Sequence, residues 1–357
     1  MNSFIKENAA DLEAFSRMSQ CAGARNDYVQ GGGGNTSAKL AGGLMGIKAS
    51  GYCLSDITPE TAYAVLDYEA LRRFYYGNES EQLADVEKQG SAFARENTKQ
   101  IEGLPTLRPS VEAGFHSILR KFVCHTHSVY ANFACCSTAC REIAEKAFAG
   151  ADYSWGWVPY TDPGANLTFA IRRELARVEH ATGRVPAVIL MQNHSHSDSA
   201  DECLRINADA NGRLAAQFGK AGDSFPKVAV KPIADGLYEV DAPALTEALQ
   251  SGRYDYRTLI ESPLYPDQMV FLIGTLFENK PELAEGEASV EFRTGRVLLR
   301  MKEKNAQVVA ETLTAVTFIM DTIRENGYTV STMGEAAKRF IANWESEKYR
   351  KSLAEKA

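Results

Sequence analysis

The stretch that decides the fold is residues 108–127, RPSVEAGFHSILRKFVCHTH. Its last six residues are an apolar run that ends in two histidines, His125 and His127, and we expect them to form a strand. Side chains two positions apart on a strand point to the same face, so both imidazoles can reach one metal ion. The alternative is a pair of packed histidines. With only six histidines in the chain, this spacing favours metal.

A second apolar run, PAVILM at residues 186–191, is followed by His194. A third imidazole would complete a zinc site of the catalytic type, in which three protein ligands leave one position open. His196 stands two residues further on, so a four-histidine site or a different third ligand stays open. For His116 packing is the more common role, although it lies near Glu112 on the expected helix.

Glu112 lies in the same decisive stretch, on a helix that Ser110 is placed to cap. A carboxylate beside a dication can serve as a general base, with a pKa set by desolvation against attraction to the metal. Its alternative role is that of an acid in the first helical turn, where it would stabilise the helix dipole.

Three segments have the composition of an anion pocket. The run GGGGNTS at residues 31–37 offers unobstructed backbone amides, but it is neither a P-loop, because Asn35 follows the last glycine, nor a dinucleotide fingerprint. The second segment, KASG at residues 48–51, supplies a cation, a hydroxyl and an open amide, and the third contains Ser110. Taken singly they could be a tight turn, a solvated lysine and a helix cap. Their combination favours phosphate binding.

The composition is that of an ordinary soluble protein, with 45% apolar and 24% charged residues among 357. No run approaches the length of a membrane span and no export signal opens the chain, so we expect a cytoplasmic protein without membrane contact. The net charge of −7 argues against nucleic acid as a partner. Seven cysteines in no regular framework indicate reduced thiols.

Strand and helix patterns alternate along the first part of the chain, which predicts an α/β layered domain over residues 1–222. Among its elements we expect a helix from about Pro59, capped by Thr58, and a strand over residues 155–160. The remainder, residues 223–357, is expected to be a smaller α+β region of unknown role. It contains a hairpin around Thr294 and Gly295 and two helices, from about 306 to 325 and 333 to 344.

Taken together, these segments resemble the class II aldolase/adducin family of zinc-dependent sugar-phosphate aldolases over residues 1 to about 220. The motifs that carry the resemblance are GGNTS, KASG, RPSVE, the HTH strand, WVPYTDPG at 157–164 and ILMQNH at 189–194. They look most like the aldolase half of bifunctional rhamnulose-phosphate aldolase/alcohol dehydrogenases. The chain has no nucleotide-binding glycine segment after them, so dehydrogenase activity is not expected.

The resemblance implies a three-layer α/β/α domain, a homotetramer in which a neighbour's tyrosine assists catalysis, and a bound zinc or another divalent metal. The residues that it implies for the metal are His125, His127 and His194. It implies that Glu112 is a ligand at rest and the acid/base residue during turnover. The residues that match the substrate-phosphate pocket are Asn35, Ser50, Gly51 and Ser110. Two positions depart from the family: Val111 replaces a hydroxyl residue, and Ser195 stands where glycine is usual.

From this resemblance we expect cleavage of a ketose 1-phosphate, similar to rhamnulose or fuculose phosphate, into dihydroxyacetone phosphate and an aldehyde. Relatives that share the metal chemistry are 4-epimerases, dehydratases and decarboxylases, and only the aldolase releases triose phosphate. An adducin-like module without catalysis is the alternative outside the enzymes. Retention of histidine at all three candidate positions argues against it.

Overall fold

The computed structural model describes residues 3–191 and 194–343. Close contacts divide the chain into two compact units, Met1–Ala131 with Glu145–Arg213, and Asn132–Ala144 with Leu214–Ala357. The expected domain boundary after residue 222 stays a prediction. The two compact units differ from it in residues 132–144 and 214–222, which belong to the second unit.

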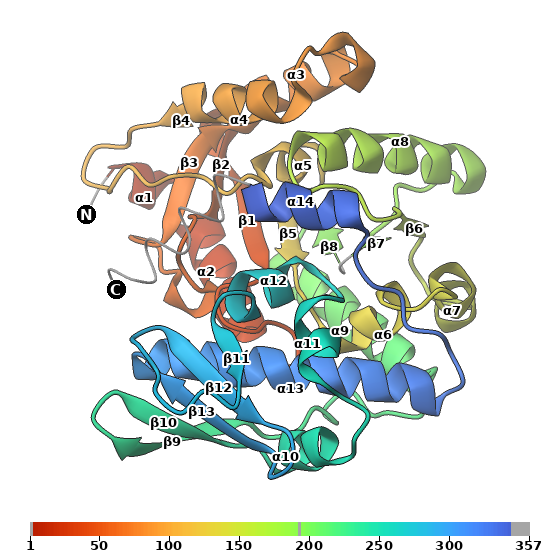
Figure 1. Ribbon diagram of the computed structural model, residues 1–357. Coiled ribbons are helices and arrows are strands. Elements are labelled where there is room, and N and C mark those ends of the chain that lie inside the picture. The colour runs from red at the N-terminus through yellow and green to blue at the C-terminus, as the bar shows by residue number, and fades with distance from the viewer. Residues whose placement is uncertain (1–2, 192–193, 344–357) are drawn as a thin grey trace. The chain divides into compact units, whose positions relative to one another are not determined.

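The first unit is built on an eight-stranded sheet (Figure 1). Its strands are β1 (Asn35–Leu40), β2 (Leu44–Lys48), β3 (Tyr63–Asp67), β4 (Thr98–Lys99), β5 (Phe122–His125), β6 (Trp155–Trp157), β7 (Val188–Leu190) and β8 (His194–Ser197). They lie in the order β4-β3-β2-β1-β5-β8-β7-β6. Among the described residues of this sheet, β6 with β7 is the one parallel pair. Every residue of β1 and β5 is buried, so both faces of the sheet centre must be covered.

Helices cover both faces of this sheet. Because neighbouring strand residues point to opposite faces, Thr36 and Ser37 of β1 identify the two layers. Thr36 Oγ1 lies 2.7 Å from Ser19 Oγ on one face, and Ser37 Oγ lies 2.7 Å from His116 Nδ1 on the other. The helices of this unit are α1 (Ser3–Glu7), α2 (Ala9–Gly23), α3 (Tyr68–Gly77), α4 (Val86–Glu96), α5 (Ala113–Ile118), α8 (Ala165–Thr182) and most of α9 (Ala200–Ala216).

The layers follow from these contacts. Ser19 belongs to α2, and the thiol of Cys203 on α9 lies 3.8 Å from the carbonyl of Phe122 in β5. His116 belongs to α5, which packs with α3, α4 and α8 in a second helical layer, as Figure 1 shows. The expected α/β fold, with helices on both faces of a sheet, is confirmed.

The helix expected from about Pro59 is wrong. The residues after a short turn form strand β3, which pairs with β2 from Tyr63 to Asp67. Tyr63, Ala64, Val65 and Leu66 are all buried, so sheet pairing and burial outweigh the local cap signal of Thr58. The helix begins only at Tyr68. The strand expected over residues 155–160 is correct in position but ends at Trp157.

The second unit contains a five-stranded sheet in the order β11-β12-β13-β10-β9. Its strands are β9 (Ala229–Ala234), β10 (Leu237–Asp241), β11 (Leu276–Glu278), β12 (Glu287–Glu291) and β13 (Arg296–Arg300). Its helices are α10 (Pro243–Gln250), α11 (Tyr256–Ile260), α12 (Pro266–Leu272), α13 (Glu303–Glu325) and α14 (Glu335–Asn343), while α6 (Val129–Cys135) and α7 (Cys140–Ala147) cross between the units. The expected hairpin is confirmed by the antiparallel pairing of β12 with β13. The expected helix end at Trp344 lies outside the described residues.

Helix α13 is, among the described residues, the one helix long and apolar enough to cross a membrane. Of its apolar window, 72% is buried inside the protein, where it packs against β9, β10, α10 and α12. The core helix of a water-soluble fold has the same length and composition, so this burial accounts for its apolar character.

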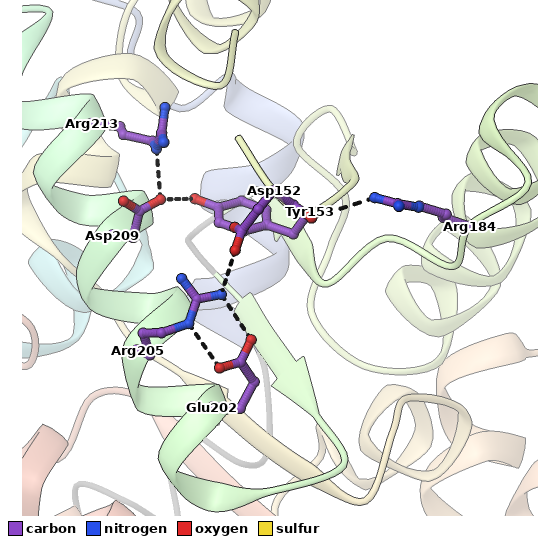
Figure 2. A network of polar contacts seen from close by, with 7 residues as sticks. All are labelled: Asp152, Tyr153, Arg184, Glu202, Arg205, Asp209 and Arg213. Atoms are coloured by element: carbon purple, nitrogen blue, oxygen red, sulfur yellow. Dashed lines mark hydrogen bonds and ion pairs between the residues drawn. The ribbon is translucent and has the colours of Figure 1, made fainter. Parts of the chain in front are cut away.

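A network of polar contacts joins α9 to the loop before β6 (Figure 2). Tyr153 donates its hydroxyl hydrogen to Asp209 at 2.8 Å, and Arg213 donates to the same carboxylate at 2.6 Å. On the same helix, Arg205 bridges Glu202 and Asp152. Exposed ion pairs of this kind are worth little each, and their shared role is to hold the loop before β6 against α9.

Asp67 links three elements of the first unit, and its substitution should destabilise the fold. Its carboxylate accepts a hydrogen bond from the Ala70 amide at 2.9 Å, which caps α3, and lies 3.3 Å from Lys99 Nζ in β4. We expect Asp67→Ala to lower the free energy of unfolding by about 1 kcal/mol in urea at pH 7. Asp67→Asn retains a side-chain oxygen that can cap α3, so its free energy of unfolding should fall by less.

The pH dependence separates the cap from the charge. Burial opposes ionisation of Asp67, but the Ala70 hydrogen bond and Lys99 hold the pKa of its carboxyl below the usual value. A carboxyl whose pKa is lower in the folded than in the unfolded protein stabilises the fold at pH values above its unfolded pKa, which is about 4 for Asp. This stabilisation is lost as the pH falls through the pKa of the folded protein. The difference between wild type and Asp67→Asn should therefore shrink below about pH 4. A constant difference down to pH 3 would contradict it.

Candidate metal centre

Strand pairing places three of the expected residues in one row. In the antiparallel register of the sheet, Asn35 of β1 lies opposite His125 of β5, and His125 lies opposite His194 of β8. Directly paired residues share a face, so the side chains of Asn35 and His125 project from the same side of the sheet. Ser37 of β1 projects from this face too, and its contact with His116 shows that α5 lies over it. The side chain of His194 lies outside the described structure.

Glu112 is the N-cap residue of α5, which lies over this row of strand residues. Its Oε2 accepts a hydrogen bond from Asn35 Nδ2 at 2.9 Å and lies 3.2 Å from Nδ1 of His125. The side chain of His125 is fully buried, and that of Glu112 is 16% exposed. One carboxylate oxygen is thus shared between a strand amide and a strand imidazole, while the group keeps limited access to solvent.

His116 completes a cluster that the sequence analysis did not single out. Glu112, His116 and His125 each offer one ligand atom, and these atoms lie within 4.8 Å of one another. His116 is four residues after Glu112, a spacing that places both on the same side of a helix, and this signal was available in the sequence. Packing was the role expected for His116, but its position inside the cluster makes it a candidate metal ligand.

The cluster has the chemistry of a divalent-metal site. Within the described part of the chain, Nε2 of the buried His116 makes no hydrogen bond, whereas its Nδ1 contacts Ser37. Burial lowers the pKa of His116 well below its usual value, which keeps the imidazole neutral, as metal ligation requires. A carboxylate with neutral imidazoles is a typical donor set for zinc and similar ions. These residues could therefore hold a divalent metal.

The electrostatics keep Glu112 ionised. Burial by itself would raise the pKa of this carboxyl, but attraction to His125 and their hydrogen bond outweigh burial. The pKa of Glu112 is therefore held well below its usual range. The group is a carboxylate at neutral pH, the form that can accept a proton or bind a cation.

His127 and His196 occupy different positions relative to the cluster. Strand β5 ends at His125, so His127 lies just beyond it, with its ring centroid 4.8 Å from that of His125. His196 is fully buried, lies opposite Val123, and lines a separate cavity with Lys39 and Arg120. The metal-ligand roles of His125, His127 and His194 stay predictions.

The three segments expected to form an anion pocket are held together. Lys48 Nζ donates to the carbonyls of Gly32 at 3.1 Å and Tyr52 at 2.8 Å, which ties the glycine run to the KASG segment. The Ser50 amide donates to the Arg108 carbonyl at 3.0 Å, next to a bridge between Ala49 and Pro109. The glycine run, Ser50, Gly51 and the segment of Ser110 therefore meet in one region.

Ser110 does not cap the helix as expected. Helix α5 begins at Ala113, Glu112 is its N-cap residue, and Ser110 Oγ accepts a hydrogen bond from the Glu112 amide at 3.3 Å. The Glu112 side chain makes no capping hydrogen bond, so its carboxylate is left to Asn35 and His125. Glu112 therefore precedes the first turn of α5, so the alternative role of an acid within that turn is wrong.

The sheet with helices on both faces and the buried carboxylate–imidazole cluster define an α/β domain with a candidate divalent-metal centre. Residues 19–196 match the family described as Class II Aldolase and Adducin N-terminal domain. This chain therefore belongs, through that domain, to the class II aldolase/adducin family. The match spans the cluster and every segment of the anion region.

Several solved structures resemble the chain at low identity. The class II aldolase domain of a conserved protein from Thermoplasma acidophilum is 18% identical, with a TM-score of 0.47, and 58% of this chain covers 92% of that one. L-fuculose 1-phosphate aldolase from Glaciozyma antarctica is 12% identical, with a TM-score of 0.37, and the match covers 61% of this chain and 76% of that one. YgbL of Klebsiella pneumoniae, a putative aldolase/epimerase/decarboxylase, is 16% identical, with a TM-score of 0.39, and the match covers 59% of this chain and 89% of that one. No curated protein matches the chain.

Gly114 allows α5 to approach its neighbours closely, and this predicts the effect of a methyl group there. An added Cβ would lie 2.5 Å from Thr168 Oγ1 and 2.7 Å from the Tyr75 hydroxyl, so α5, which follows Glu112 and carries His116, would have to shift. We expect Gly114→Ala to reduce the free energy of unfolding by about 1–3 kcal/mol in urea denaturation.

Gly212, in the interior of α9, is the matched control. A Cβ there meets nothing within 4 Å, so Gly212→Ala should stabilise by about 0.5–1 kcal/mol through helix propensity alone. Equal and small effects of the two substitutions would show that the packing of α5 is loose.

Proposed function

We propose that this protein is a metal-dependent aldolase that cleaves a ketose 1-phosphate, similar to rhamnulose or fuculose phosphate, into dihydroxyacetone phosphate and an aldehyde. The observation that carries the proposal is the position of Glu112, a largely buried carboxylate in contact with Asn35 and His125 and near His116. The protein's membership of the class II aldolase/adducin family supports the same class of reaction.

In this proposal zinc, or another divalent ion, is held by His125, His127 and His194, with Glu112 as a further ligand at rest. His116 stands close enough to Glu112 and His125 to join or support this set. A bound divalent ion supplies Lewis acidity, which polarises the substrate oxygens next to the bond that breaks.

Glu112 moves the proton. Its low pKa makes it a carboxylate in the resting protein, able to take the hydroxyl proton or to return a proton to carbon. Asn35 holds Oε2 through its amide, which fixes the direction in which the carboxylate faces. This gives Asn35 a positioning role in addition to the phosphate contact that the family resemblance implies.

The substrate phosphate would bind at Asn35, Ser50, Gly51 and Ser110. The meeting of the glycine run, the Ser50 segment and the Ser110 segment supports this location. Gly51 has a φ of +91°, which a residue with a side chain rarely adopts, and the missing side chain leaves room for an anion to approach the backbone. The homotetramer, the assisting tyrosine and the cytoplasmic location stay predictions.

Metal removal and substitution of Glu112 test the mechanism. We expect purified protein to contain about one divalent ion per chain by plasma mass spectrometry, and a chelator to abolish triose phosphate release from rhamnulose and fuculose 1-phosphates. Glu112→Gln should lower kcat by about 100-fold or more, because the amide cannot carry the proton.

Thermal melting of Glu112→Gln provides the control for folding. Full turnover by this variant, or by metal-free protein, would overturn the mechanism. Conversion of the substrates without triose phosphate would instead assign the protein to the epimerases, dehydratases or decarboxylases of the family.

The phosphate pocket has a separate test. Ser50→Ala should raise the KM for a ketose 1-phosphate by about tenfold, because one hydrogen bond to a charged group is lost, with little change in kcat. Ser224→Ala, an exposed hydroxyl whose hydrogen bond is to the Ala221 carbonyl, is the control and should leave KM unchanged. An unchanged KM in Ser50→Ala would remove Ser50 from the pocket.

A further inference from the structure

A cavity lies on the face of the first sheet that carries Asn35 and His125, toward the Leu40 end of β1 and the Ser197 end of β8. Its volume is about 630 Å³, in the range of small-molecule sites. Lys39, two residues beyond Ser37 on β1, and His196, two beyond His194 on β8, line it. None of Glu112, His116 and His125 lines this cavity, so it is distinct from the metal cluster.

The lining carries more cations than carboxylates. The cations are Lys39, Arg72, Arg120 and Lys121, and the carboxylates are Asp11 and Asp198. Lys121 pairs with Asp11 at 2.7 Å, and Arg120 lies 3.4 Å from Asp198. Within the described residues Lys39 and Arg72 have no carboxylate partner, and their charged groups contact aromatic rings, those of Tyr68 and Tyr76.

Lys39 is the most unusual of these cations because its side chain is buried. Its Nζ donates to the carbonyls of His116 at 2.5 Å and Arg120 at 2.7 Å. Carbonyl dipoles orient an ammonium group but do not neutralise it, and a buried charge without a counter-charge is costly. Burial lowers the pKa of Lys39 well below its usual value, and an anion in the cavity would supply the counter-charge that favours the ammonium form.

His196 is a second polar residue that lines this cavity. The residue is fully buried, and within the described part of the chain neither ring nitrogen has a hydrogen-bond partner. Buried polar atoms in folded proteins are normally satisfied, so two orphaned nitrogens on a cavity wall indicate a polar ligand. A neutral imidazole can donate one hydrogen bond to an anion.

We propose that this cavity binds a small molecule through a phosphate group. The two cations without a carboxylate partner, Lys39 and Arg72, match the charge of a phosphate dianion. A guanidinium group such as that of Arg72 or Arg120 can donate two parallel hydrogen bonds to phosphate oxygens. The cavity volume exceeds that of a phosphate alone and leaves room for the rest of a phosphorylated metabolite. The site shares no residue with the proposed substrate-phosphate pocket, so the two proposals are independent.

Calorimetric titration of the full chain with inorganic phosphate, at an ionic strength held constant with chloride, tests the proposal. Ser50→Ala is the background, so that the proposed substrate pocket contributes little. Arg72→Gln and Arg120→Gln should each weaken saturable phosphate binding by about tenfold, the loss of one charged hydrogen bond. Arg73→Gln, a change at the exposed neighbour that contacts Glu69, should leave it within about twofold.

Melting temperatures without phosphate confirm that the variants fold. The proposal is overturned if phosphate does not saturate in the Ser50→Ala background, or if Arg73→Gln loses as much affinity as Arg72→Gln. A parallel titration with glucose 6-phosphate separates the sources of the phosphate group. Tighter binding of the ester assigns a phosphorylated metabolite, and tighter binding of the inorganic ion assigns free phosphate.

Discussion

The shared Oε2 atom of Glu112 is the contact on which the arrangement of the candidate site depends. Asn35 reaches it from β1 and His125 from β5, so the carboxylate joins two central strands to the start of α5. A buried carboxylate needs such partners to remain ionised, and here they are an amide and an imidazole. The pairing of β1 with β5 thus fixes the geometry of a reactive group as well as the core.

Close helix packing sets the height of that carboxylate above the sheet. Gly114 in α5 lies against Tyr75 and Thr168, and Gly90 in α4 lies against Ala165 in α8, each closer than a methyl group would allow. Side chains on these helices would move α5 away from β1 and β5. Small residues at helix contacts are therefore part of the construction of the site, although none of them touches its chemistry.

One face of the sheet serves two electrostatic environments. Near Asn35 and His125 the partner is a carboxylate, whereas near Lys39 and Arg120 cations predominate. Ser37 and His116 stand between them, and the Lys39 ammonium donates to the carbonyl of His116. A single row of strand residues can thus line the candidate metal centre at one end and the proposed anion cavity at the other, because alternate side chains of a strand share one face.

The sequence by itself determined the α/β class, the hairpin near Gly295 and the segments around Glu112 and His125, because these depend on local periodicity and residue chemistry. It failed at β3, where a cap signal at Thr58 lost to pairing with β2, and at Ser110, which supports Glu112 instead of capping α5. Only the tertiary structure placed His116 beside Glu112 and His125, joined Asn35 to Glu112, and put Lys39 and His196 on the wall of one cavity. These contacts join residues far apart in the chain, or depend on where a helix begins, and no local pattern encodes that information.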